Sequence, residues 1–460
     1  MKSRMPRVFI SAAHKSSGKT TLTLGLCAAL HARGHAVQPF KKGPDYIDPL
    51  WLGMAAQRPC YNLDFHMMRR DEIAQQFASA AAAARISLIE GNKGLYDGLD
   101  LDGSNSNAAL AKLLDAPVVL VIDARGMTRG VAPLILGYQA FDRDIRIAGV
   151  ILNNLGGSRH EAKLRAVIEH YTDVEVIGAV QHDATLQIAE RHLGLVPANE
   201  QQAALERVRR VGERVAAQVD LGRLLAIADS AADRDAPASP PPREQAERLR
   251  IALAHDRAFG FYYSEDLDAL RAANVELVEL DTLQAPGLPQ VDGLVIGGGF
   301  PEMFMAELET NASLRADIRR AIEAGLPTYA ECGGLMYLSQ SLSWQAQTRQ
   351  MVGVVPGDTV MHERPVGRGY ARLQPTGADR WQETENIPAH EFHHSSLENL
   401  PNDSIYAYKV TRGHGIDGQH DGYQRYNLLA AYAHRRGAGE QGWITPFLNQ
   451  VRAHKARAAA

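Results

Sequence analysis

A repeated alternation of short apolar runs and longer helical patterns is the sequence feature that most constrains the fold of this chain. The apolar runs have the length and composition of buried strands and lie at Arg7 to Ser11, Ile86 to Glu90, Pro117 to Asp123 and Ile147 to Leu152. Longer segments with helical periodicity lie between such runs, at Thr20 to Ala32 and Asp71 to Ala84. This order predicts a parallel sheet with helices on both faces, as in doubly wound α/β domains.

One stretch interrupts the alternation. Residues Ser230 to Glu247 contain three consecutive prolines and almost no apolar periodicity, which is typical of an extended linker. After this stretch the strand–helix order restarts, with strands expected at 249–255, 275–280 and 293–296 and a helix near 264–273. A chain of 460 residues is also long enough for two or three domains. We therefore predict two α/β domains, residues 1–232 and 248–460, joined by a linker at 233–247.

Charge and cysteine content exclude several classes of protein. Lys and Arg number 49 against 53 Asp and Glu, so the chain lacks the basic excess of a nucleic-acid-binding protein. The N-terminal segment turns polar after four apolar residues, and no run approaches the ~18 apolar residues of a membrane span. The odd cysteine count, Cys27, Cys60 and Cys332, argues against a disulfide framework. We expect a cytoplasmic enzyme or ATPase with no nucleic-acid or membrane partner.

The segment VFISAAHKSSGKTTLTLGL has the strand, loop and helix of a mononucleotide-binding site. In such loops the lysine, here Lys19, reaches the β- and γ-phosphates, and the hydroxyl of Thr20 binds Mg²⁺. Ala13 stands where the first glycine of the motif usually lies, so we expect a variant loop conformation. The expected ATP-binding residues are the consecutive positions Ser17, Gly18, Lys19, Thr20 and Thr21.

Four acidic residues are candidates for the metal and the reacting groups near the nucleotide. Asp45 and Asp48 follow a strand-like run in VQPFKKGPDYIDP, and Glu90 and Asp97 lie in SLIEGNKGLYDG. Carboxylates at the carboxyl ends of neighbouring strands commonly complete a Mg²⁺ shell. Glu90 and Asp45 are the stronger candidates, whereas all four also fit helix caps and turn residues.

A second candidate site lies in PTYAECGGLMYLS, which is typical of a buried strand, a sharp turn and a helix. This geometry exposes the thiol of Cys332 at a helix N-terminus, where the helix dipole favours the thiolate. Backbone N–H groups of Gly298 or Gly299, from LVIGGGFPE, could stabilise an oxyanion together with Gly333. The alternative is that Cys332 is a small core residue.

A nucleophilic thiol requires a base. His434, in NLLAAYAHRR, ends an apolar run that could hold its ring against the thiol. His390, His393 and His394, in AHEFHHSS, are competitors for this role. These histidines could also suggest a metal site, but neither a cysteine pair nor HExxH spacing accompanies them.

Six motifs together resemble the cobyrinic acid a,c-diamide synthase family. In chain order they are the GKT loop, KKGPDYIDP, NLDFHM, EGNKGLYDG, GGGFPE and AECGGLMYL, and the resemblance covers about Val8 to His434. It implies a dethiobiotin-synthetase-like ATP domain followed by a class I glutamine amidotransferase domain. In that family glutamine is hydrolysed through a cysteinyl thioester. ATP phosphorylates an acetate side chain of a tetrapyrrole-derived macrocycle, and the released ammonia converts it to an amide.

The resemblance also implies roles for individual residues. Cys332 would be the nucleophile and His434 the group that raises its reactivity. In the first domain it implies phosphate and Mg²⁺ groups at Lys19 and Thr20, Mg²⁺ carboxylates at Asp45 and Glu90, and acidic residues near the reacting carboxylate at Asp48 and Asp97. Implied partners are glutamine and a tetrapyrrole polycarboxylate, and a homodimer is left open.

The sequence departs from the family pattern in both domains. Many glutamine amidotransferases have a glutamate two positions after the histidine, but this chain has Arg436 there, so we predict a Cys–His dyad without an orienting carboxylate. Lys42 and Lys93 replace commonly apolar residues beside the acceptor site. Two added cations favour a more anionic acceptor, such as sirohaem in the branch associated with dissimilatory sulfite reductase. Alternatively, both lysines are solvated or pair with nearby aspartates.

Two other functions also fit part of the sequence. The first domain also resembles switch ATPases that position cargo, but their characteristic lysine falls at His14, with Lys15 one place away, and the second domain would then have no role. The second alternative is a synthetase with an inactive glutaminase domain that uses free ammonia.

Overall fold

The computed structural model describes residues 2–183, 190–191, 194–200, 203–236, 247–378, 381, 383 and 385–459. The chain forms two compact units, Met1–Pro240 and Pro241–Ala460. Strand β11 (Arg234–Asp235) pairs with β1 (Lys2–Ser3), so the first residues of the predicted linker pack on the first unit. The rest of that linker, at 237–246, lies outside the described residues.

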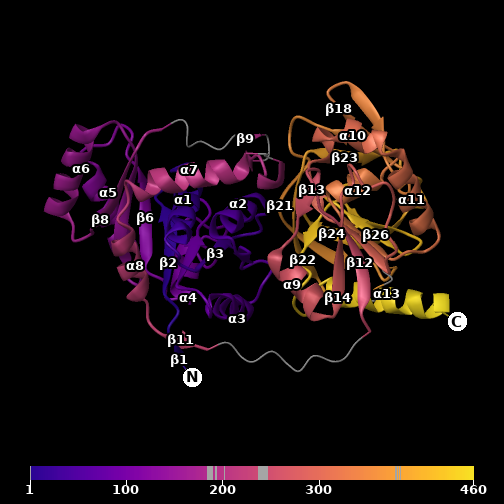
Figure 1. Ribbon diagram of the computed structural model, residues 1–460, viewed down its shortest axis with the longest axis horizontal. Coiled ribbons are helices and arrows are strands. Elements are labelled where there is room, and N and C mark those ends of the chain that lie inside the picture. Colours follow the sequence, from indigo (N-terminus) through magenta and orange to yellow (C-terminus); the bar gives the residue numbers. More distant parts are fainter. Residues whose placement is uncertain are drawn as a thin grey trace. The chain divides into compact units, whose positions relative to one another are not determined.

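Seven described strands form the sheet of the first unit, in the order β4-β3-β5-β2-β6-β7-β8, and all their pairings are parallel (Figure 1). Their bounds are β2 Arg7–Ala12, β3 Val37–Lys42, β4 Tyr61–Leu63, β5 Ile86–Glu90, β6 Val118–Asp123, β7 Ile147–Leu155 and β8 Val176–Gln181. The strand order reverses at β2, which lies between β5 and β6. Ligands of such sheets bind at this switch point, beyond the carboxyl ends of the strands.

Helices cover both faces of this sheet, as predicted. One core contains the apolar faces of four helices, α1 Lys19–Ala32, α2 Ile47–Ala56, α7 Ala204–Ala216 and α8 Leu221–Asp229. The opposite core contains those of α3 Arg70–Ala81, α4 Asn107–Leu113, α5 Val131–Phe141 and α6 Ser158–Tyr171. The predicted doubly wound arrangement is therefore confirmed for the first unit. Helix α3 ends three residues before the predicted end at Ala84, because the last alanines form a turn.

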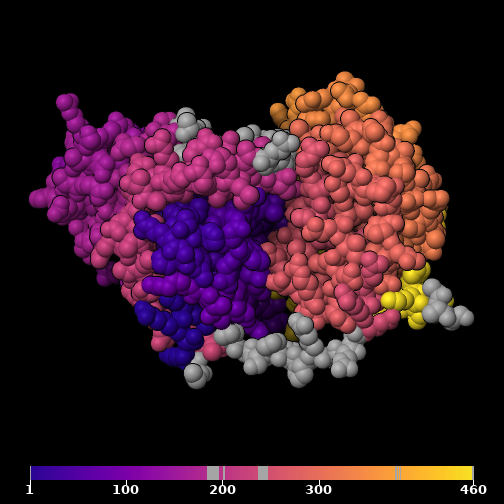
Figure 2. Space-filling view, viewed as in Figure 1, coloured from indigo at the N-terminus to yellow at the C-terminus, as the bar shows by residue number. Residues whose placement is uncertain are grey.

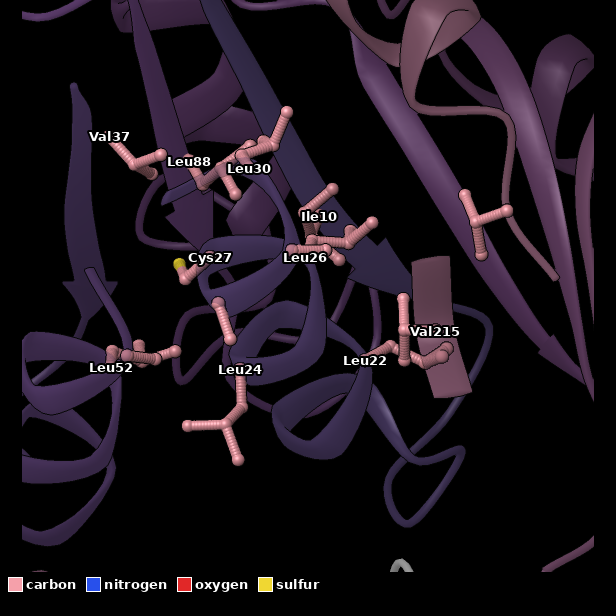
Figure 3. Packing of buried hydrophobic residues seen from close by; sticks show 14 of the residues in the cluster. Ile10, Leu22, Leu24, Leu26, Cys27, Leu30, Val37, Leu52, Leu88 and Val215 are labelled. Carbon is pink, nitrogen blue, oxygen red and sulfur yellow. The ribbon is translucent and has the colours of Figure 1, made fainter. Parts of the chain in front are cut away.

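Close packing of α1 against α7 depends on two glycines. A Cβ at Gly25 would collide with Val215, and a Cβ at Gly212 would lie 2.8 Å from that of Ala28. In Figure 2 the magenta surface of residues near 210 borders the indigo surface of the N-terminal residues. Figure 3 shows Cys27 of α1 among apolar side chains, and burial raises the pKa of this thiol. Cys27 is thus a structural residue.

Ten described strands form the main sheet of the second unit, in the order β14-β12-β15-β17-β26-β25-β24-β21-β22-β27. The parallel half consists of β12 Leu249–Ala254, β14 Val275–Leu280, β15 Gly293–Ile296, β17 Thr328–Glu331 and β26 Leu428–Ala431. The antiparallel half consists of β21 Gly367–Pro375, β22 Ile387–His393, β24 Ile405–Arg412, β25 His420–Arg425 and β27 His434–Arg435. The predicted α/β class is confirmed, while the antiparallel extension was not predicted.

Smaller elements complete the second unit. The described helices are α9 Ser264–Ala272, α10 Met305–Thr310, α11 Ala312–Glu323, α12 Gly333–Leu338 and α13 Ile444–Ala459. A short pair is formed by β13 Phe259–Phe261 and β16 Gly298–Gly299, and a four-stranded sheet by β18 Ser341–Trp344, β19 Gln347–Gln350, β20 Asp358–Met361 and β23 Ser395–Glu398. Within the described parts of the chain, no helix is both long and apolar enough to span a bilayer.

Candidate functional site

The phosphate loop connects the end of β2 to the first turn of α1. Its left-handed backbone positions are Ser16 (φ 64°) and Gly18 (φ 86°), and Ala13 is not among them. This explains how alanine can replace the first glycine of the motif. The side chain of Asn153 donates to the carbonyl of Ser17 over 2.9 Å and occupies the space beside Gly18 that a Cβ would need. The loop is therefore tied to the end of β7.

An acid–lysine cluster lies at the first turn of α1. The Thr20 hydroxyl donates to Glu90 Oε1 over 2.7 Å and lies 3.3 Å from Asp48 Oδ2. Lys41 Nζ donates to the same two atoms, over 2.9 Å to Glu90 and 2.5 Å to Asp48. Three predicted residues are thus brought together, and Lys41 is an addition that the sequence analysis missed. The signal that could have found it was its position near the carboxyl end of the strand-like run 37–42, directly before the turn that carries Asp45 and Asp48.

Burial governs the electrostatics of this cluster. Burial raises the pKa of Glu90, which is fully buried, although Lys41 and Thr20 oppose the shift. Burial would lower the pKa of Lys41, but Asp48 and Glu90 outweigh it and hold the pKa well above its usual value. For Lys19 the nearby carboxylates, Glu90 foremost, do not outweigh burial, which lowers its pKa to about 8. Lys41 is therefore the firmly charged cation of the cluster.

The other two predicted acids have mainly local contacts. Asp45 Oδ1 accepts the backbone N–H groups of Ile47 (2.9 Å) and Asp48 (3.1 Å) at the start of α2, and burial raises its pKa. Asp97 is exposed, and its Oδ2 accepts the N–H of Gly94 over 2.8 Å. Asp48, expected near the acceptor, is the carboxylate that lies with Thr20 and Glu90. The roles assigned to Asp45 and Asp97 stay predictions.

The residues of this cluster fit a divalent cation. Glu90 Oε2 is buried and has no hydrogen-bond partner among the described residues. A hydroxyl and carboxylates are the oxygen ligands that Mg²⁺ prefers, with phosphate oxygens and water completing its shell. Thr20, Asp48 and Glu90 are the residues that could hold it.

The two unusual lysines lie near one another at the same end of the sheet. Lys42 is the last residue of β3 and is 5% exposed, whereas Lys93 is exposed in the loop after β5. A Cβ at Gly43 would lie 3.2 Å from the side chain of Asn92, so the two segments touch. Burial lowers the pKa of Lys42 to about 8, with Asp64 opposing and Lys93 adding to the shift. The segments that carry the two predicted cations therefore contact each other.

The candidate nucleophile of the second unit lies in a strained turn between β17 and α12. Cys332 has φ 48° and ψ −102°, is 7% exposed, and donates its N–H to the carbonyl of Ala431 over 2.7 Å. Strain at a non-glycine residue persists only where the surroundings enforce it, and it clusters at functional sites. The turn has the strand–nucleophile–helix geometry that the sequence predicts.

The three predicted oxyanion glycines pack around this turn. A Cβ at Gly333 would lie 3.0 Å from the backbone N of Gly299, which shows how closely the two loops approach. A Cβ at Gly298 would lie 2.6 Å from Cε1 of His434. Close approach without side chains is what an oxyanion site of backbone N–H groups requires. Their role as donors stays a prediction.

His434, the predicted base, has a carboxylate partner. Glu331 Oε2 lies 3.3 Å from His434 Nδ1, and a hydrogen bond joins His434 to Cys332. Burial lowers the pKa of His434, but Cys332 and Glu331 outweigh it and raise the pKa to about 10. The predicted dyad without an orienting carboxylate is therefore wrong. Arg436, which suggested it, faces Glu265 instead, with Nε 3.9 Å from Oε1.

The competing histidines have other partners. The His390 ring stacks on that of His434 with centroids 4.9 Å apart. His393 stacks on Tyr432, and its Nδ1 lies 2.8 Å from the carbonyl of Ser395. His394 Nδ1 lies 3.2 Å from the carbonyl of His362. Among the residues that the structure describes, no group of three or more His, Cys, Asp or Glu side chains could hold a metal ion.

The two units and their sites define a class of enzyme in which a P-loop nucleotide-binding domain precedes a glutamine amidotransferase domain. Residues 9–196 match the CobQ/CobB/MinD/ParA nucleotide binding domain. Residues 250–440 match the CobB/CobQ-like glutamine amidotransferase domain.

The chain is also similar over nearly its whole length to curated cobyrinate a,c-diamide synthases. It is 48% identical over 452 residues to that of Magnetococcus marinus, with 97% of each chain covered. It is 43% identical over 460 residues to that of Methanosarcina acetivorans, covering 94% of this chain and 93% of the relative. It is 39% identical over 435 residues to that of Archaeoglobus fulgidus, with 94% of each covered. The chain therefore belongs to the cobyrinate a,c-diamide synthase family and is a carbon–nitrogen ligase that uses glutamine as its nitrogen donor.

Proposed function

We propose that this chain uses ATP and glutamine to amidate the a and c acetate side chains of a cobyrinate-type macrocycle, in cobalamin-type cofactor biosynthesis. The observation that carries the proposal is that one chain contains both a phosphate loop with the Thr20–Glu90–Lys41 cluster and a thiol–imidazole site at Cys332 and His434. The relatives' names support the acceptor class. A cargo-positioning ATPase would leave the second site without a role.

The first unit activates the acceptor. A carboxylate is a poor acyl donor because its leaving group would be oxide, so the γ-phosphoryl group of ATP is first transferred to it, giving an acyl phosphate and ADP. Ammonia then attacks the acyl carbon and displaces phosphate, leaving the amide. Lys19 and Lys41 provide positive charge where the transferring phosphoryl group gathers negative charge. Bound Mg²⁺, held by Thr20, Asp48 and Glu90, would supply further positive charge to the phosphates.

The second unit supplies the ammonia. The Cys332 thiolate attacks the side-chain carbonyl of glutamine, and His434 gives a proton to the departing ammonia, which leaves a thioester. Water then hydrolyses the thioester to glutamate and restores the thiol. Free ammonia is mostly protonated at neutral pH and cannot attack, so production from glutamine provides it in the reactive form. Gly299 and Gly333 are proposed to stabilise the oxyanion in both steps.

Sirohaem is the second candidate acceptor, and the proximity of Lys42 to Lys93 favours it. Two neighbouring cations beside the acceptor suit a macrocycle with additional carboxylates. Replacing both lysines by methionine should then shift preference from the more anionic acceptor toward cobyrinic acid. Unchanged preference would remove the sirohaem alternative.

The proposal is tested by glutamine- and acceptor-dependent ADP release from the purified protein. Cobyrinic acid, hydrogenobyrinic acid and sirohaem are offered in parallel, and products are weighed by mass spectrometry. Two amide-for-acid mass changes on a corrinoid are expected, whereas amidation of sirohaem alone would select the second candidate. No turnover with any of the three would contradict the proposed acceptor class.

A Cys332→Ala variant tests the glutaminase separately. It should lose glutamine-dependent turnover and keep turnover with added ammonia. If the wild-type protein itself used only free ammonia, the second unit would be an inactive glutaminase. A cytoplasmic location and a homodimer also stay predictions; the first is supported by the three unpaired cysteines.

A further inference from the structure

Glu331 lies directly before the candidate nucleophile in sequence and beside the candidate base in space. It is the last residue of β17, and its side chain is 8% exposed. Its Oε2 lies 3.3 Å from Nδ1 of His434, 103 residues further along the chain. We propose that Glu331 is the positioning residue that orients the His434 ring toward Cys332 and stabilises the imidazolium, an inference that rests on the proposed glutaminase function.

The Glu331 carboxylate is itself fixed in place. Its Oε1 accepts the hydroxyl of Tyr329 over 2.5 Å and the backbone N–H of Arg435 over 2.8 Å. The Tyr329 ring stacks on Trp443 with centroids 4.4 Å apart, and the Arg435 guanidinium bonds Glu383 over 2.5 Å. Rotation of the carboxylate would break two hydrogen bonds in the buried interior, which costs more there than in water. Its orientation toward the imidazole is thereby maintained.

This contact determines which ring nitrogen faces the thiol. A carboxylate accepts hydrogen bonds, so His434 donates from Nδ1, and Nε2 is left for Cys332. The same division of ring nitrogens is used by the carboxylate–imidazole pairs of hydrolases. When the thiol transfers its proton to the ring, the negative charge of Glu331 stabilises the resulting cation.

Other titratable groups also surround the imidazole. The His390 ring stacks on its face, and His390 Nδ1 lies 3.1 Å from the hydroxyl of Tyr263. Two stacked imidazoles repel each other when both are protonated, so only a protonated His390 would oppose the positive charge on His434. Glu331 is the carboxylate in contact with the ring, and it favours that charge.

The test compares Glu331→Gln with Glu383→Gln. Both variants neutralise a carboxylate that bonds Arg435, but only Glu331 touches His434. Glutamine hydrolysis is measured as kcat and KM over a range of pH. Ammonia-dependent ADP release and thermal melting report whether each variant is folded.

We expect Glu331→Gln to lower kcat for glutamine about 10²-fold with KM changed less than about threefold. The alkaline limb of the pH profile of kcat should move to lower pH, because His434 loses a carboxylate that helps to raise its pKa. Glu383→Gln should stay close to wild type in both measurements. Glu331→Asp, which keeps the charge on a shorter side chain, should recover part of the lost kcat.

Two results would overturn the positioning role. One is an unchanged kcat and pH profile in Glu331→Gln, and the other is an equal change of both in Glu383→Gln. If Glu331→Gln fails to fold, Glu331→Asp takes its place. A decrease in kcat of about 10²-fold with an unchanged pH profile in Glu331→Asp would then overturn the positioning role. Failure of the proposed glutaminase function is a different result, since either the wild-type protein would not hydrolyse glutamine or Cys332→Ala would still hydrolyse it.

Discussion

Replacing Gly298 by alanine should disable the use of glutamine and spare the use of free ammonia. The added Cβ would lie 2.6 Å from Cε1 of His434 and 3.3 Å from Cβ and Cδ2 of Phe261. Carbon atoms in contact rest at about 3.5–4.0 Å, so the imidazole must retreat by roughly 1 Å. A displacement of that size in a reacting group can cost on the order of 10²-fold in rate.

The assay is ADP release with the acceptor and either glutamine or ammonium chloride as nitrogen source. Gly298→Ala should lower glutamine-dependent turnover about 10²-fold and change ammonia-dependent turnover less than about twofold. Gly137→Ala is the matched control, because no atom lies within 4 Å of a Cβ at that position. Glutamine-dependent turnover within threefold of wild type would refute the reasoning, since the ring would then not depend on the space above Gly298. Equal loss of both activities would also refute it, because the damage would not be confined to the imidazole.

Three further outcomes are expected. Glu90→Gln should reduce acceptor-dependent ADP release at least about 10²-fold, because the cluster loses a charge, while glutamate release in the same sample persists. The pKa of His434 is raised to about 10 from ~6.5 when unfolded. Its stabilising contribution is thus full below pH ~6.5 and lost as the pH rises through about 10. Wild-type melting temperature should fall more steeply than that of His434→Gln between pH 7 and 10; parallel curves would contradict this. Gly25→Val should destabilise the first unit by about 1–3 kcal/mol in urea unfolding through collision with Val215, and Gly137→Ala should not; equal midpoints would contradict the close helix packing.

Features encoded by neighbouring residues were predicted well from the sequence. Strand β5 has the predicted bounds, Ile86–Glu90, and α1 begins one residue before the predicted start at Thr20. A glycine follows each of these segments closely, Gly91 after β5 and Gly34 after α1, so local rules suffice to place their ends. The contacts of Thr20 with Glu90 could be anticipated because parallel strands end at one edge of a sheet.

Contacts between distant segments could not be predicted in the same way. The Glu331–His434 contact needs β17, β26 and β27 in their actual places, and the sequence pattern does not fix the register of antiparallel strands. Lys41 was missed because a lysine in a strand usually faces solvent, whereas here two carboxylates compensate its burial. Asp45 and Asp48 are three residues apart, and only the placement of α2 shows which of them faces Thr20.

Placing the orienting carboxylate on β17 has a consequence for the strand that carries the histidine. In the proposed mechanism the carboxylate and the thiol are adjacent in sequence, at Glu331 and Cys332, and β27 contributes one catalytic residue, His434. The next two residues stabilise the end of the sheet instead: Arg435 forms an ion pair with Glu383, and Arg436 faces Glu265. Strand β27 thus holds the edge of the sheet through Arg435 and the adjacent Arg436, and it contributes His434 to the site. Substitutions of Arg435 or Arg436 should therefore weaken the attachment of β27 to the sheet before they change the chemistry of glutamine hydrolysis.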